Sequence, residues 1–191
     1  MKKRSTRKSE NRSLMINAVL DTIAEDGLAN ANVRQISDKA GVSFGNFHYH
    51  FGGKDGLLLE ALKQLLKQIQ VLTKEEVAKS NTPAEQLNLY VEAQINPSIF
   101  TNRNAVIWLN FWNEASTNES FARFELLNRR RLRSNIRYYL RACGVIKNVE
   151  EIAADTHVLI DGLWMHKALM KDGLKLEDAL ATVRRKLKLL T

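Results

Sequence analysis

Three tryptophans and two carboxylates carry the most distinctive chemistry in the second half of this 191-residue chain. Trp108 and Trp112 are four residues apart, so in a helix their rings lie along one face. Asp161 stands three residues before Trp164, which again puts both side chains on one helical face. Indole faces attract cations and carboxylates add the opposite charge, so the natural guest of such a cage is a quaternary ammonium ion. The predicted ligand-binding residues are Trp108, Phe111, Trp112, Glu114, Asp161 and Trp164.

The same residues allow other interpretations. Tryptophans are large apolar side chains that could fill a hydrophobic core without binding anything. Asp161 and Trp164 could belong to a subunit interface instead. An enzyme acting on a small amine would need a nucleophile beside a base, but Cys143 has no evident partner and His157 and His166 are isolated in the sequence. We therefore predict that the chain is not an enzyme and has no cofactor.

A second group of residues, between positions 32 and 54, is suited to contacting DNA. Asn32 is the expected N-cap of a short helix through Ala40, Gly41 ends that helix, and Ser43 caps another short helix running to about His50. Two short helices joined by a three-residue turn that contains glycine form a helix-turn-helix. The second helix of this motif presents its N-terminal residues to base edges in the major groove.

The exposed start of that second helix is where we expect the bases to be read. Phe44 could contact a thymine methyl group, and Asn46 could pair with adenine through two hydrogen bonds. Gly45 allows the backbone to approach the groove closely, and the amides after Ser43 can meet a phosphate. The DNA-binding candidates are Asn32, Arg34, Ser43, Phe44, Gly45 and Asn46, with His48, Tyr49 and Lys54 as contacts to the DNA backbone.

His48 and His50 raise the question of a metal site. Residues two apart point to different sides of a helix, so one ion cannot easily take both. No Cys, Asp or Glu of suitable spacing lies beside them. We predict no metal.

Helical periodicity dominates the chain, and no stretch shows the sustained alternation that a half-buried strand needs. We predict an all-α fold of about nine helices. The first three form a helix-turn-helix domain, residues 1–53, and the others form a ligand-binding and dimerisation domain, residues 54–191. The expected helices, with caps, cover about 11–26, 32–40, 43–50, 54–80, 83–95, 103–116, 119–142, 149–171 and 176–190.

The charge distribution favours an anionic partner. The formal net charge is +8, and residues 1–12 hold six lysines and arginines against Glu10 alone. We expect a flexible basic arm that follows a phosphate backbone or enters a minor groove; a solubilising tail is the alternative. Arginines also recur every four residues from Arg129 to Arg141. They could form a second anion-binding surface, but we favour a solvated helix face paired with acids.

Compartment and membrane association can also be addressed from composition. The lone Cys143 excludes an internal disulfide and fits a reducing cytoplasm. No stretch approaches the ~20 apolar residues of a membrane span, and no apolar signal segment follows the basic N-terminus. We expect a cytoplasmic protein with no membrane partner.

The segment from Val33 to Phe51, followed by Lys54, resembles the tetracycline-repressor family of bacterial transcription regulators. That family carries Ile-Ala, two variable residues, Ala-Gly-Val-Ser, a glycine two positions on, and an aromatic cluster ending in His-Phe. Here the run reads Ile-Ser-Asp-Lys-Ala-Gly-Val-Ser-Phe-Gly, and the cluster ends at Phe51. His48 stands where the family usually has tyrosine, and it can still donate to a phosphate. The resemblance covers roughly residues 14–60.

Three stretches of the second half are similar to the betaine-biosynthesis repressors, members of that family that control choline-to-glycine-betaine genes and respond to choline. They are Trp108-Leu-Asn-Phe-Trp112, the arginine-rich run from Asn128 to Asn135, and Leu159-Ile-Asp-Gly-Leu-Trp164. The likeness implies an effector that is choline or a related cationic amine. Members with other ligands share the Asp-Gly-Leu-Trp stretch, so a non-amine apolar ligand is the alternative.

One helix-turn-helix domain, called a reader below, makes too few base contacts to recognise an operator specifically. We therefore expect a homodimer on a palindromic operator. The predicted function is a repressor whose effector shifts the long helix beginning at Lys54 and changes the separation of the two readers. An architectural DNA-binding protein without a ligand would instead show weak sequence preference. Family likeness places the dimer interface on the last two long helices, with candidate positions that could equally be core: Ile152, Leu159, Leu163, Leu180, Val183 and Leu187.

Overall fold

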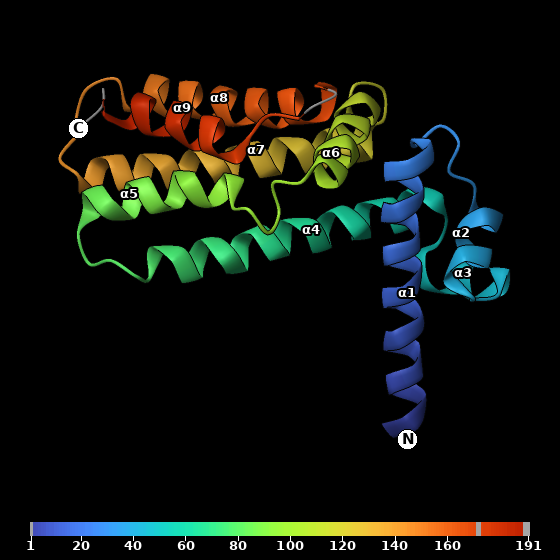
Figure 1. The fold of residues 1–191 in the computed structure, drawn as a ribbon. Helices are drawn as coiled ribbons and strands as arrows, with labels where there is room; N and C mark the ends of the chain where they lie inside the picture. The colour runs from blue at the N-terminus through green and yellow to red at the C-terminus, as the bar shows by residue number, and fades with distance from the viewer. Residues whose placement is uncertain (1, 171–172, 189–191) are drawn as a thin grey trace. The chain divides into compact units, whose positions relative to one another are not determined.

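The structure, a computed structural model, describes residues 2–170 and 173–188; the side chains of residues 2–8, Phe44 and Asn46 lie outside the description. The described residues form nine α-helices and one 3-10 helix, and they include no strand (Figure 1). The all-α prediction is therefore confirmed. The chain divides into two compact units, Met1–Leu66 and Lys67–Thr191, which we describe separately. The functional division at residues 53 and 54 remains a prediction.

The N-terminal unit contains α1 (Lys2–Asp26), α2 (Val33–Ala40), α3 (Phe44–Phe51) and the first half of α4 (Lys54–Val77). Local signals fix the helix ends. The Asn32 side chain accepts a hydrogen bond from the Gln35 amide at 2.8 Å, and Gly41 ends α2 with a left-handed φ of 64°. Apolar residues of all four helices meet in one small core, and the least exposed of them are Met15, Val19, Ile36, Phe47 and Leu57.

The first helix is longer than the sequence indicated. We predicted a flexible arm followed by a helix starting near Asn11. This was wrong, because the backbone is already helical from Lys2, where α1 begins. The prediction rested on apolar periodicity, which starts only at Leu14 and Met15. The preceding residues contain neither glycine nor proline, and their lysines and arginines favour helix without needing a buried face.

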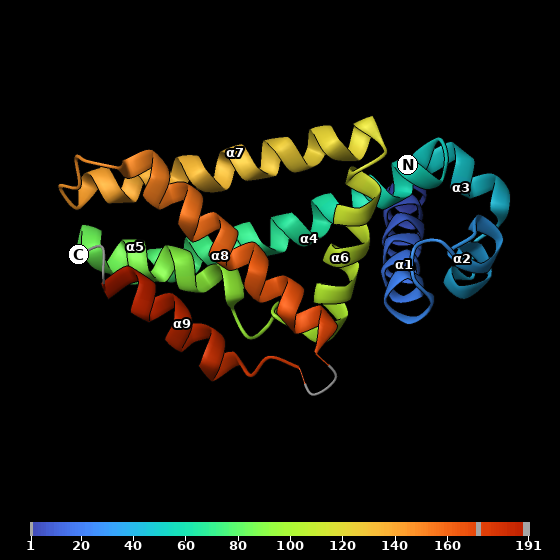
Figure 2. The ribbon, with the colours of Figure 1, turned by 90° about the horizontal axis from the view of Figure 1, so that it is seen from above.

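The C-terminal unit contains the rest of α4 and six further elements. They are α5 (Pro83–Glu92), the 3-10 helix η1 (Ala93–Ile95), α6 (Asn102–Ala115), α7 (Glu119–Ala142), α8 (Val149–Leu169) and α9 (Leu176–Lys188). Helix α8 packs against α6, α7 and α9, and Figure 2 shows it running obliquely between α7 and α9. Every predicted helix is present, with ends that differ from the expected ones by a few residues outside α1. None of the helices among the described residues is both long and apolar enough to cross a membrane.

Candidate functional site

The predicted base-reading surface lies at the start of α3. Ser43 is extended, with φ −64° and ψ 146°, and its side chain makes no cap hydrogen bond. A side chain at Gly45 would meet no atom within 4 Å, so this part of α3 presents bare, exposed backbone. Phe44 and Asn46 share this turn of the helix, and their side chains lie outside the description. The next residue, Phe47, is fully buried and anchors the helix from the opposite face.

The other DNA-binding candidates divide between exposed and structural positions. His48 is exposed, and Tyr49 keeps 72% of its surface in contact with solvent. Arg34 is exposed on α2. In contrast, the Lys54 ammonium donates to the Leu28 carbonyl at 3.1 Å, and Asn32 serves as the cap of α2. Both of these side chains therefore have a role in holding the unit together.

A cavity of about 500 Å³ opens in the C-terminal unit among α6, α7 and α8. Trp112 contributes an indole from α6, and Asp161 contributes a carboxylate from α8. Trp108 lies behind Trp112, with ring centroids 6.3 Å apart, and Phe111 packs edge-on against Trp108 at 5.5 Å. The cavity is lined by Trp112, Ala115, Ser116, Ala122, Glu125, Leu126, Arg129, Asp161 and Met165.

Four of the six predicted ligand residues do not line this cavity: Trp108, Phe111, Glu114 and Trp164. The Trp164 indole N–H donates to the Gln94 carbonyl at 3.2 Å, and its ring packs edge-on against Phe100 at 5.0 Å. Trp164 therefore fills the core between α8 and η1. Glu114 lies near the end of α6 and does not line the cavity. Three tryptophans do not converge here; one indole faces the cavity, with a second behind it.

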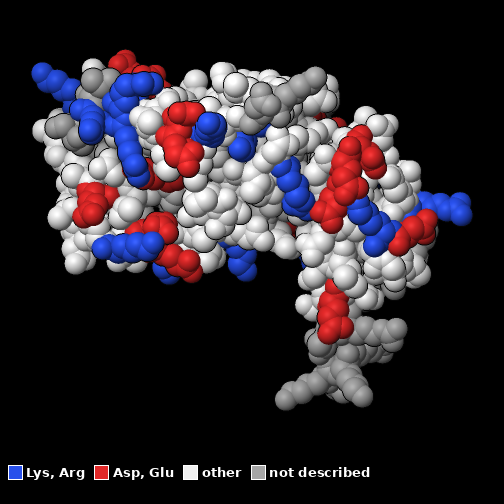
Figure 3. Space-filling view, viewed as in Figure 1, with Lys and Arg blue, Asp and Glu red and all other residues white. Residues whose placement is uncertain are grey.

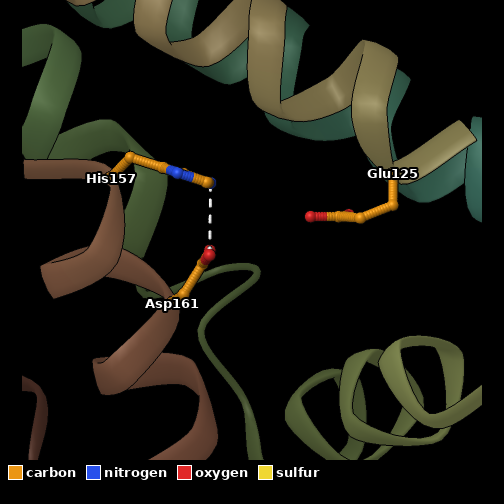
Figure 4. A group of neighbouring side chains, drawn as sticks. All are labelled: Glu125, His157 and Asp161. Carbon is orange, nitrogen blue, oxygen red and sulfur yellow. Dashed lines mark ion pairs between the residues drawn. The ribbon is translucent and has the colours of Figure 1, made fainter. Parts of the chain in front are cut away.

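Sequence reasoning predicted Asp161 but missed the two residues that cluster with it, Glu125 and His157. Glu125 on α7 and His157 and Asp161 on α8 offer ligand atoms that all lie within 4.8 Å of one another (Figure 4). Glu125 and His157 each carried a signal in the sequence. Glu125 falls four residues after the buried Phe121, and His157 falls four after the buried Ala153. A titratable side chain on the apolar stripe of a helix marks a site that has to be paired or liganded.

Burial controls the electrostatics of this cluster. Burial raises the pKa of Glu125, against the opposing effect of Arg129, Trp112 and Asn128, and its Oε2 atom has no hydrogen-bond partner among the described residues. Burial and the neighbouring Glu125 raise the pKa of Asp161 to about 7, against the opposing effect of Arg129 and Arg133. Burial and these same two arginines lower the pKa of His157 to about 4. The imidazole is therefore neutral at physiological pH, and the cluster carries negative charge only on its carboxyl groups.

The tautomer of His157 argues against a metal ion in the cluster. Arg133 Nε donates to His157 Nδ1 at 3.3 Å, so the neutral ring carries its proton on Nε2, the atom that faces Asp161. A metal bound at Nε2 would move that proton to Nδ1, directly opposite the Arg133 N–H. This geometry suits an organic cation, which needs negative oxygens and a ring face but no free imidazole lone pair.

Three arginines of α7 form ion pairs. Arg129 lies 3.5 Å from Glu125, while Arg137 and Arg141 lie 2.6 and 3.7 Å from Glu150. Basic and acidic side chains are also interspersed over the face drawn in Figure 3. These contacts support the interpretation of the arginine stripe as a helix face paired with acids.

Comparison with known proteins identifies the family of the chain. The profile of the bacterial regulatory proteins of the tetR family matches residues 16–61, and that of the C-terminal part of BetI-type transcriptional repressors matches residues 83–191. The chain belongs to the tetR family, and its C-terminal part is of the BetI type. The sequence-based family assignment is therefore confirmed, and the protein is a transcriptional repressor.

Individual tetR-family relatives extend over most of the chain. The HTH-type transcriptional regulator BetI 1 of Chromohalobacter salexigens is 31% identical over 88% of this chain and 84% of its own length. BetI of Vibrio parahaemolyticus is 30% identical over 86% of this chain and 84% of its own. These tetR-family relatives are regulators, not enzymes, in agreement with the prediction.

Solved structures of transcriptional regulators share the fold. A transcriptional regulator of Saccharomonospora viridis, solved in complex with choline, has a TM-score of 0.83 and 24% identity, covering 94% of this chain and 96% of that chain. A transcriptional regulator of Pseudomonas aeruginosa has the same TM-score and identity, covering 94% of this chain and 89% of that one.

Proposed function

We propose that this repressor acts as a homodimer on a palindromic operator and is released by a quaternary ammonium compound, with choline as the leading candidate. The observation that carries the proposal is the buried, unpartnered Glu125 oxygen in a cavity that also presents Asp161 and the Trp112 ring. The BetI-type C-terminal part and the choline-bound Saccharomonospora viridis regulator support this ligand class. The target genes would be those of choline-to-glycine-betaine metabolism, in the cytoplasm.

The charges around the cavity favour a cation over a neutral apolar ligand. Ion pairing with Arg129 uses the other oxygen of Glu125, at a long 3.5 Å, and leaves Oε2 unpaired. A buried acceptor without a partner costs free energy that a bound cation would recover. A quaternary ammonium has no N–H donors, so it needs nearby negative charge and a ring face, and the two carboxylates and Trp112 offer both.

We place the contact with DNA on the N-terminal part of α3. Asn46 and Phe44 would read base edges, Gly45 would let the backbone approach, and the Ser43 end of the helix would meet a phosphate. His48, Tyr49 and Arg34 would hold the DNA backbone. Asn32 and Lys54, whose side chains also stabilise the unit, would contribute more weakly.

The dimer interface that we propose is an exposed apolar face of α8. Val158, Met165 and Leu169 are 63%, 42% and 63% exposed, and with Gly162 they follow one another at intervals of four, three and four residues. That spacing keeps them on one helical face, as packing against a second copy of α8 requires. Of the interface candidates taken from the sequence, Leu163, Val183 and Leu187 are buried in the core, and Ile152, Leu159 and Leu180 are half-buried.

Coupling between effector and operator requires a conformational difference that the ligand senses. Helix α4 runs without a break from Lys54 in the N-terminal unit to Val77 in the C-terminal unit, so it is the covalent path between them. The effector must bind more tightly to the form that does not bind the operator, and this difference in affinity limits how far it can shift the equilibrium.

A titration with matched ligands tests the proposal. Choline and its uncharged carbon analogue 3,3-dimethylbutanol have nearly the same shape, and both would be added to the repressor–operator complex while Trp fluorescence and operator release are recorded. We expect choline to quench fluorescence and release the operator, and the neutral alcohol to do neither at the same concentration. Equal responses to both compounds would instead support an apolar, non-amine effector.

A further inference from the structure

A second cavity, of about 300 Å³, lies elsewhere in the C-terminal unit, between α4, the α5–η1 segment and α7. Its described lining residues include none from the cation pocket and no carboxylate. The charged side chains among its described lining residues are Arg131 and Lys74, both positive. The lining residues are Ile69, Gln70, Thr73, Lys74, Val77, Tyr90, Gln94, Arg131, Asn135 and Tyr139.

Arg131 on α7 takes part in none of the ion pairs found among the described residues of that helix. Its guanidinium is half-buried and donates to Asn128 Oδ1 at 3.3 Å, and no carboxylate among the described residues lies within ion-pair distance of it. Burial lowers its pKa, but an arginine remains charged in a protein. A partly desolvated cation without a counter-charge is costly unless an anion joins it.

Two other lining residues, Tyr90 and Lys74, supply further hydrogen-bond donors. Asn135 Nδ2 donates to the Tyr90 hydroxyl oxygen at 3.0 Å, which leaves the hydroxyl proton of Tyr90 available to a ligand in the cavity. Lys74 adds a second positive charge from α4. A carboxylate is the small group that accepts from a guanidinium, a phenol and an ammonium at once.

The remaining lining suits an apolar body attached to that group. The Tyr90 and Tyr139 rings pack with centroids 5.2 Å apart, and Ile69 and Val77 add aliphatic surface from α4. Gln94 is already engaged, because its amide donates to Thr73 Oγ1 and to the Tyr90 carbonyl. The described lining thus combines positively charged and hydroxyl donors with aromatic and aliphatic surface.

We infer that this cavity is a second ligand site, for a small organic carboxylate with an aromatic or short aliphatic body. The ligand carboxylate pairs with Arg131 and accepts from Tyr90, and its body lies against the tyrosine rings. The site goes beyond the proposed function, because it takes a ligand of opposite charge in a different cavity. Five of its lining residues belong to α4, the helix that continues into the N-terminal unit.

Calorimetric titration of the full chain with benzoate and with benzamide tests this site. The two probes have almost the same shape and differ in charge. We expect benzoate to bind at least about tenfold more tightly than benzamide, the usual difference for a charge-assisted contact. Arg131→Gln should weaken benzoate binding by about the same factor, Arg131→Lys should weaken it less, and Arg130→Gln, at the exposed neighbouring position, should leave it unchanged.

Several results would overturn the inference: equal binding of the two probes, unchanged benzoate affinity in Arg131→Gln, or no binding of benzoate at all. If Arg131→Gln fails to fold, Lys74→Gln carries the test and should weaken benzoate binding a few-fold. Asp161→Asn separates the two sites. It should abolish tight choline binding and leave benzoate binding intact, so failure of the cation proposal does not decide the fate of this one.

Discussion

His157 and Asp161 lie one helical turn apart on α8, with the histidine Nε2 3.2 Å from the aspartate Oδ2. Arg133 holds the other ring nitrogen from α7, at 3.3 Å. The chain Arg133–His157–Asp161 thus fixes the position of one carboxylate oxygen from behind and leaves the other for the cavity. A neutral histidine can do this without adding positive charge that would repel a cationic ligand.

Cation binding should depend on pH through Asp161. Because its pKa is raised to about 7, the carboxyl group is largely protonated in mildly acidic solution and ionised in mildly alkaline solution. Tetramethylammonium does not titrate, so its dissociation constant reports the protein alone. We expect its affinity to fall about tenfold between about pH 8 and pH 6. Isothermal titration across this range measures the effect.

The Asp161→Asn variant is the control for that pH profile. It should bind tetramethylammonium weakly at every pH and show a nearly flat profile between about pH 6 and 8. A steep profile that survives in Asp161→Asn would assign the titration to another group and contradict the role given to Asp161.

The free energy of unfolding should carry the same signature. The pKa of Asp161 is raised from 3.8 to about 7, so its contribution to stability is fully present below pH 3.8 and is lost as the pH rises through about 7. The lowered pKa of His157 acts in the opposite direction: its contribution to stability is present above pH 6.5 and is lost as the pH falls through about 4. Asp161→Asn keeps the histidine and removes only the first effect.

Urea unfolding of the two proteins at several pH values separates these contributions. Relative to the original protein, Asp161→Asn should become progressively more stable as the pH rises from about 4 to about 8. A constant difference over this range would mean that Asp161 titrates in the folded chain as it does in the unfolded one.

Dimerisation should depend on the exposed face of α8. Val158→Glu places a charge on the proposed interface and should convert the dimer to a monomer, because an unpaired charge is costly in a buried apolar contact. Ile146→Glu, at a 90% exposed position in the α7–α8 loop, is the matched control and should stay dimeric. Sedimentation velocity reports the state of each variant; a dimeric Val158→Glu would move the interface elsewhere.

Operator recognition should separate into base reading and backbone contact. Asn46→Ala should cost about 1–3 kcal/mol of operator affinity and relax the sequence preference at one base pair. Tyr49→Phe should weaken binding to every operator variant by the same factor, because a contact to the DNA backbone does not depend on the base sequence. Lys147→Gln, exposed in the C-terminal unit, serves as the control. Gel-shift assays on a set of single-base operator variants distinguish these outcomes, and an unchanged preference in Asn46→Ala would remove Asn46 from the reading surface.

The core position on α3 should be far more sensitive to truncation than the exposed one. Phe47→Ala removes a fully buried ring whose centroid lies 6.1 Å from that of Phe51. It should lower the free energy of unfolding by about 3–5 kcal/mol. Tyr49→Ala, two residues on and mostly exposed, should change the free energy of unfolding by less than about 0.5 kcal/mol. Chemical denaturation measures both, and similar losses would mean that α3 is packed differently.

The sequence by itself determined the helices and the reading motif, because the signals involved are local. Asn32 and Gly41 set the ends of α2 through contacts within a few residues, and the spacing of apolar side chains marks the buried faces. Family membership followed from the same dense segment. Only the start of α1 was misjudged, because helix propensity without a buried face leaves no periodic pattern.

The binding sites depended on tertiary structure, because their parts are distant along the chain. Glu125 lies more than thirty residues before His157 and Asp161, and only the packing of α7 on α8 brings the three together. The packing of α8 against η1 places Trp164 in the core, although its spacing from Asp161 predicted that both would line one ligand site. Spacing shows which side chains share a helix face. Which face meets which neighbour is decided by the packing of whole helices.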